Sequence, residues 1–79
     1  MYKIYKKVEN LGIYDFIIVD CYSNQYFHSS LTKFHSSVLG YGDYARRSIE
    51  GDQYIYIGEC KYRKEVLNVL PMLDLLADI

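Results

Sequence analysis

The chain has no tryptophan, a single proline and only two cysteines among its 79 residues. Two cysteines are too few for the disulfide framework of a small secreted domain, so we expect both thiols to be reduced, as in a cytoplasmic protein. No apolar run approaches the roughly 20 residues that a membrane-spanning helix needs. The N-terminal residues also lack the apolar core of a signal peptide. The sequence therefore predicts a cytoplasmic protein with no membrane partner.

Neither sign of charge dominates, because nine Lys and Arg face ten Asp and Glu. A dedicated duplex-binding protein would usually be strongly basic. Hydrophobic residues make up 51% of the chain, which is enough for a core and argues against disorder. The length predicts a single domain over residues 1–79. A domain this small is marginally stable alone, so we expect self-association, as in a homodimer.

No arrangement of reactive side chains predicts catalysis. Cys21, His28, His35 and Cys60 are chemically suited to zinc, but they lie seven, seven and twenty-five residues apart instead of in close pairs. Ser36 and Ser37, next to His35, lack the strained turn that accompanies a catalytic serine nucleophile. We therefore expect no enzyme activity, no metal ion and no cofactor.

Two triplets spell the halves of the GIY-YIG nuclease signature, Gly12-Ile13-Tyr14 and Tyr56-Ile57-Gly58. In that family the triplets lie close together, on adjacent strands of one hairpin. Here more than forty residues separate them. The family also needs an arginine on a helix that follows the triplets, whereas Arg46 and Arg47 lie between them. These departures argue against the assignment.

Hydrophobic periodicity and turn residues predict an α+β fold. The expected architecture is a small, mostly antiparallel sheet of three or four strands in ββ(β)αβα order, with the helices packed on one face. Pro71 is expected to kink or split the last helix. The predicted strands are 2–8, 13–22, 25–28 and 53–57, and the predicted helices are 29–39, 43–50 and 61–79.

The first of these helices is predicted from a stripe at helical spacing. Leu31, Phe34, Val38 and Leu39 would share one face, and a serine at 29 or 30 would cap the N-terminus. The same region holds a short echo, because Phe-His-Ser-Ser at 27–30 recurs at 34–37. Four residues are too few to indicate a repeat architecture.

Tyrosine is the abundant residue, with ten copies. The segment 13–19 carries large apolar side chains on both faces of an extended strand, which is typical of a strand covered on both sides. Alternation along 13–22 and 53–57 predicts one aliphatic and one aromatic face, provided that the strands pair in register. The aliphatic set is Ile13, Ile17, Val19, Ile55 and Ile57, and the aromatic set is Tyr14, Phe16, Ile18, Tyr22, Tyr54 and Tyr56.

Two functions follow if the aromatic face is exposed. The first is a small non-catalytic protein-interaction module, such as a viral or mobile-element inhibitor that occupies a host protein. The alternative is a single-stranded nucleic-acid-binding protein that stacks bases on the tyrosines, with nearby Lys and Arg for phosphates. The face would instead be core if residues 61–79 covered it. The predicted partner-binding residues are Tyr14, Phe16, Tyr54 and Tyr56, with Arg46 and Arg47 at the rim.

Overall fold

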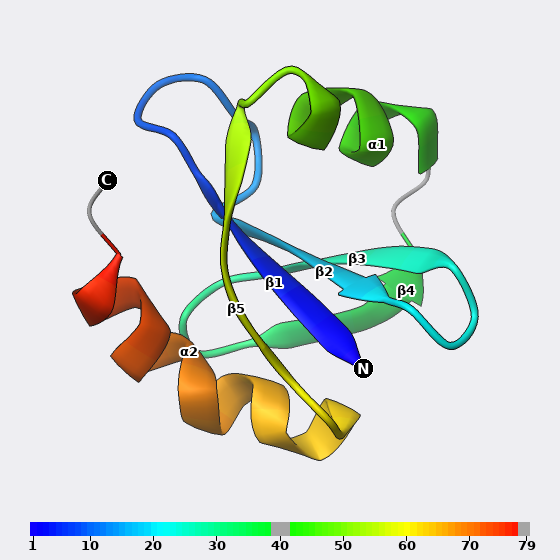
Figure 1. The fold of residues 1–79 in the computed structure, drawn as a ribbon, viewed down its shortest axis with the longest axis vertical. Coiled ribbons are helices and arrows are strands. Elements are labelled where there is room, and N and C mark those ends of the chain that lie inside the picture. The colour runs from blue at the N-terminus through cyan, green and yellow to red at the C-terminus, as the bar shows by residue number, and fades with distance from the viewer. Residues whose placement is uncertain (39–41, 78–79) are drawn as a thin grey trace.

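The computed structural model describes residues 1–38 and 42–77 (Figure 1). The α+β class is confirmed, but these residues form five strands instead of three or four. The segment predicted as a first helix is the additional strand, so the order is ββββαβα. The elements are β1 (Tyr2–Lys7), β2 (Phe16–Asp20), β3 (Gln25–Ser29), β4 (Phe34–Val38), α1 (Gly42–Glu50), β5 (Tyr54–Cys60), the short 3-10 helix η1 (Arg63–Glu65) and α2 (Val66–Leu76).

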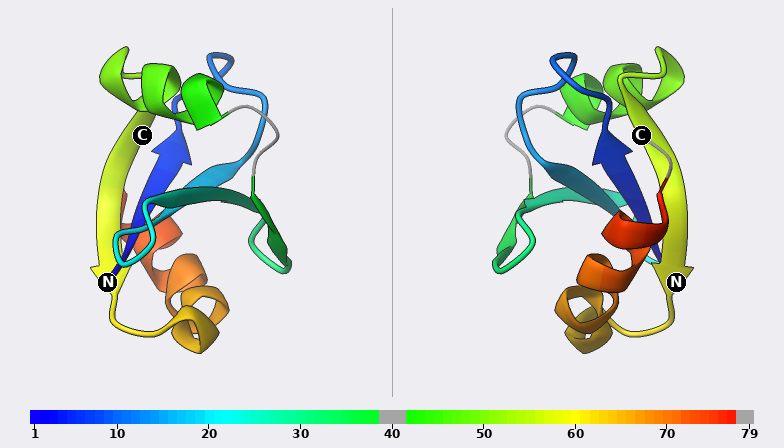
Figure 2. Two further views of the ribbon diagram at one scale, coloured as in Figure 1. Left: turned by 90° about the vertical axis from the view of Figure 1, so that its right-hand side faces the viewer. Right: turned by 90° about the vertical axis from the view of Figure 1, so that its left-hand side faces the viewer.

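The five strands form one antiparallel sheet in the order β4-β3-β2-β1-β5. The first four strands follow one another as a meander, and β5 returns after α1 to pair with the free side of β1. Asn24 adopts a positive φ of 59° in the turn between β2 and β3, a conformation that asparagine tolerates well. Figures 1 and 2 show a strongly twisted sheet with β4 and β5 at its two edges.

The helix predicted over 29–39 was wrong, because the two serines close a turn instead of capping a helix. The Ser30 backbone N–H donates to the carbonyl oxygen of Lys33 at 2.9 Å, and the Ser30 hydroxyl accepts from the Lys33 N–H at 3.1 Å. The Ser29 hydroxyl lies 2.9 Å from the same Lys33 carbonyl. These bonds fix the β3–β4 hairpin. Leu39, one residue of the predicted stripe, lies outside the described residues.

The hairpin brings the two copies of the Phe-His-Ser-Ser echo side by side. The rings of Phe27 and Phe34 lie 5.5 Å apart, and those of His28 and His35 stack at 3.9 Å. Because neighbouring strand residues point to opposite faces, the phenylalanines pair on one face and the histidines on the other. The repeated dipeptide therefore places like side chains together across the hairpin.

The two helices cover opposite faces of the sheet, which corrects the prediction that both pack on one face. α2 packs Val66 and Leu70 against a core of Ile4, Phe16, Ile18 and Phe27. α1 packs Ala45 against Ile17 and Tyr54 on the other face. Figure 2 shows the two helices on either side of the strands. β2 is apolar on both faces, and each face therefore needs its own cover.

The predicted division into an aliphatic and an aromatic face was also wrong. β1 lies between β2 and β5, and Tyr5 of β1 pairs with Ile17 on one side and Tyr56 on the other. Lys6 likewise pairs with Phe16 and Ile55. The β5 tyrosines therefore share a face with Ile17, and the β5 isoleucines share one with Phe16. Ile13, assigned to the core, instead lies exposed in the loop before β2.

Candidate functional site

The six predicted partner-binding residues do not form one surface. Phe16 is 3% exposed and lies in the α2-facing core, whereas Tyr54 is 1% exposed and lies in the α1-facing core. Tyr14 is half-buried beside Tyr54, and Tyr56 remains exposed on β5. A buried Phe16 or Tyr54 has no free surface with which to contact a partner. The two arginines, Arg46 and Arg47, are exposed on α1.

The Tyr54 side chain has a structural role that its position in β5 did not reveal. Its hydroxyl donates to the carbonyl oxygen of Tyr14 at 2.6 Å and accepts from the Tyr14 N–H at 2.8 Å. The hydroxyl of Tyr44 accepts from the N–H of Ile13 at 3.0 Å. Burial raises the pKa of Tyr54, so the phenol stays protonated. These bonds fasten the β1–β2 loop to β5 and α1.

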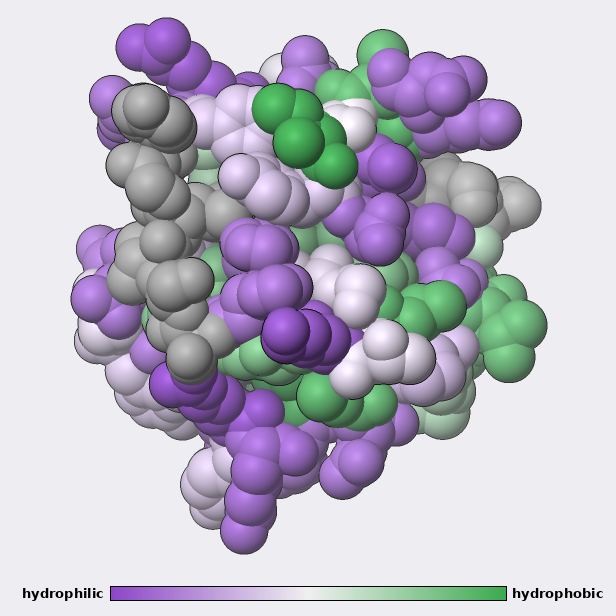
Figure 3. Space-filling view, turned by 180° about the vertical axis from the view of Figure 1, so that it is seen from behind, coloured by the Kyte–Doolittle hydropathy of each residue, from purple (hydrophilic) through white to green (hydrophobic). Residues whose placement is uncertain are grey.

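An exposed apolar surface lies at the C-terminal end of α2. Leu75 is 85% exposed, Leu76 is 76% exposed, and Met72 is also exposed. In Figure 3 apolar atoms gather at the right-hand side, where the end of α2 lies after the half-turn from Figure 1. We call these three residues, Met72, Leu75 and Leu76, the α2 apolar surface. Contiguous exposed apolar side chains are candidates for a contact site.

A pocket of about 420 Å³ adjoins the α2 apolar surface. Lys6 bonds to Asp74 at 2.8 Å and Lys7 to Asp15 at 3.6 Å, so its charged lining is internally paired. Asp74 directly precedes Leu75, which places the pocket next to the exposed leucines. The lining residues are Lys6, Lys7, Asp15, Phe16, Ser30, Leu31, Thr32 and Asp74.

A second surface, which the sequence reasoning missed, lies at the opposite end of α2. Residues 61–64 read Lys-Tyr-Arg-Lys, and all four side chains are exposed. The Arg63 guanidinium lies 4.9 Å from the ring centre of Phe34 and 5.3 Å from that of Phe27. Three cations in four residues were the available signal, but the stretch was interpreted only as the beginning of a helix.

The histidines form a ring stack on the α1-facing side of the sheet. Tyr14 stacks on His28 at 4.4 Å, and His28 stacks on His35 at 3.9 Å. Burial lowers the pKa of His28, and the charge of His35 lowers it further. Within residues 1–38 and 42–77, no three His, Cys, Asp or Glu side chains come close enough to hold a metal ion.

No helix in the described ranges is both long and apolar enough to cross a membrane. No protein-family model, curated protein or solved structure matches the chain.

Proposed function

We propose that the chain is a non-catalytic protein-interaction module that binds through the α2 apolar surface and its adjoining pocket. The observation that carries this proposal is the exposure of Leu75 and Leu76 on a helix whose other face is buried at Val66 and Leu70. Removing a leucine side chain from water is worth about 1.5–3 kcal/mol. Two exposed leucines therefore provide a strong driving force for association.

A second copy of the chain is the occupant that this surface fits best. The leucines protrude directly beside a pocket, so a two-fold axis would place the leucines of each copy against the pocket of the other. The pocket is lined by two lysines and two aspartates, which gives it no excess of either charge. Its lining therefore does not repel an identical surface. A small inhibitor of viral or mobile-element origin could use the same leucines against a host protein.

Sedimentation equilibrium on wild-type protein and a Leu75→Ser/Leu76→Ser variant tests the proposal. In a two-fold dimer the variant loses four buried leucine side chains, at least about 6 kcal/mol, so the dimer dissociation constant should rise by about 10⁴-fold. A Leu11→Ser/Ile13→Ser variant is the matched control, because both residues are exposed apolar side chains in the β1–β2 loop. Its dissociation constant should equal that of the wild type.

Affinity capture with the same three proteins extends the test to other partners. Proteins retained by the wild type and the loop control, but lost by the α2 variant, would support a hetero-partner at this surface. The proposal is wrong if the wild type stays monomeric and all three proteins capture the same set.

A further inference from the structure

The exposed basic segment at 61–64 brings three cationic side chains together, those of Lys61, Arg63 and Lys64. The described ion pairs use Lys6, Lys7 and Arg46. Lys61, Arg63 and Lys64 make no ion pair with a described carboxylate. These three cations can therefore contact an anionic ligand, although the chain as a whole has a net charge of −1.

Three carboxylates lie near the basic segment, and two of them accept hydrogen bonds from other groups. Asp20 accepts from the Ser23 hydroxyl at 2.8 Å and from the Tyr22 N–H at 2.9 Å. Glu59 accepts from the Tyr56 hydroxyl at 2.5 Å. Only Glu65, which is half-buried, follows the basic segment directly. Bonds from neutral donors leave these carboxylates charged, so the segment offers three cations without an ion-pair partner among the described residues, with acidic groups close by.

Aromatic rings interleave with these cations. Lys61 and Lys64 lie 5.5 and 6.0 Å from the ring centre of the exposed Tyr62. Arg63 lies over the rings of Phe27 and Phe34, a cation–π arrangement that holds the guanidinium in place. A held guanidinium loses less side-chain freedom when it binds an anion.

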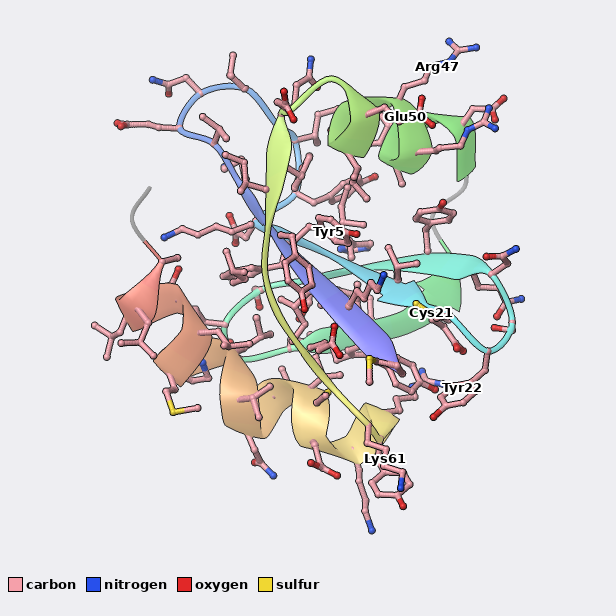
Figure 4. All side chains as sticks on the ribbon, in the orientation of Figure 1. Tyr5, Cys21, Tyr22, Arg47, Glu50 and Lys61 are labelled. Carbon is pink, nitrogen blue, oxygen red and sulfur yellow. The ribbon has the colours of Figure 1, made fainter. Side chains whose placement is uncertain are left out.

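Further rings and a hollow extend this surface. Tyr2 pairs with Cys60 just before the segment, and its ring meets that of the 70% exposed Tyr22 edge-on at 6.2 Å. Figure 4 shows Tyr22 and Lys61 at the same end of the molecule, away from Arg47. A hollow of about 480 Å³ opens beside Arg63 and Lys64, and Phe34 and Leu67 complete its lining.

From these observations we propose that this end of the molecule binds single-stranded nucleic acid. Phosphates would contact Lys61, Arg63 and Lys64, and bases would stack on the exposed rings or enter the hollow. An acidic protein segment would use the same cations but would leave the rings and the hollow without a planar ligand. The proposal does not depend on the α2 apolar surface.

Fluorescence anisotropy with a short, labelled oligothymidine tests the proposal across a salt series. Three phosphate contacts predict a slope of about −2 in the logarithm of affinity against the logarithm of salt. The dissociation constant should therefore rise by about 20-fold between about 50 and about 200 mM salt. In a Lys61→Gln/Lys64→Gln variant the rise should fall to about threefold, because one phosphate contact remains.

An Arg46→Gln/Arg47→Gln variant is the matched control, since it removes the same charge from α1 at the far end of the molecule. It should keep both the affinity and the salt slope of the wild type. A Tyr62→Ala variant should lose at least about fivefold in affinity with the slope unchanged, because it removes a stacking ring and no charge.

Three outcomes would overturn the proposal. The first is absence of oligothymidine binding in low salt, and the second is an equal loss of affinity in the arginine and lysine variants. The third is a polyglutamate peptide that displaces the oligonucleotide at equal charge concentration, because that would show a site for acidic chains in general.

Discussion

Replacing Tyr54 by phenylalanine isolates the contribution of one buried hydroxyl group. The ring, which is 1% exposed, would keep its packing, while the two hydrogen bonds to the backbone of Tyr14 would be lost. Each such bond contributes about 1 kcal/mol net, and a buried polar group left unpaired costs about 1–3 kcal/mol. Because Tyr14 is only half-buried, water would form hydrogen bonds with part of its unpaired backbone N–H and carbonyl group. We expect a loss of about 2–4 kcal/mol.

That loss is large for a chain of 79 residues, whose total stability would be roughly 4–12 kcal/mol. Urea unfolding followed by circular dichroism measures it as a lower midpoint with an unchanged slope. Tyr56→Phe is the matched control, because it removes a hydroxyl with one exposed partner, Glu59. The control should lose less than about 0.5 kcal/mol. Equal losses in the two variants would refute a structural role for the Tyr54 hydroxyl.

Two further predictions concern packing and pH. In Gly12→Ala the added Cβ would lie 2.6 Å from the Tyr54 ring, so we expect a loss of about 1–3 kcal/mol in urea unfolding; wild-type stability would show that the loop yields freely. Because burial and His35 lower the pKa of His28 in the folded state, the unfolded chain binds more protons below about pH 6.5. The contribution of neutral His28 to the free energy of unfolding should therefore be fully present above that pH. It should be lost on acidification towards the lowered pKa of His28 in the folded state. In His28→Asn this part of the pH dependence should disappear, and a stability that rises on acidification would contradict the reasoning.

Local pattern was enough to predict most elements. The predicted strand 2–8 corresponds to β1, Tyr2–Lys7, and the predicted helix 43–50 corresponds to α1, Gly42–Glu50. The last helix begins later than predicted, because Tyr62 is extended and residues 63–65 form a 3-10 turn. Pro71 lies inside α2 without splitting it. These segments carry their own periodicity and turn residues, which do not depend on distant contacts.

Pairing between strands could not be predicted in the same way. The alternation in 53–57 correctly separates tyrosines from isoleucines. It does not say which side chains of the other strands share a face with each set. That choice depends on β1, which inserts between β2 and β5. The predicted exposed aromatic face depended on the same pairing. Phe16 and Tyr54 are buried because α2 covers one face of the sheet and α1 covers the other. The basic segment at 61–64 could have been identified from the sequence, because three of its four residues are Lys or Arg.

The two proposed surfaces lie at opposite ends of one helix, and this separation makes them independently testable. α2 runs from Val66 to Leu76, so at 1.5 Å per residue its ends are roughly 15 Å apart. At physiological salt the screening length is about 8 Å, so removing charge at Lys61 and Lys64 should hardly change association at Leu75 and Leu76. Serine at the two leucines should likewise leave oligothymidine affinity unchanged. If either pair of substitutions affects both measurements, then α2 itself has been displaced, and neither loss of binding identifies a contact surface.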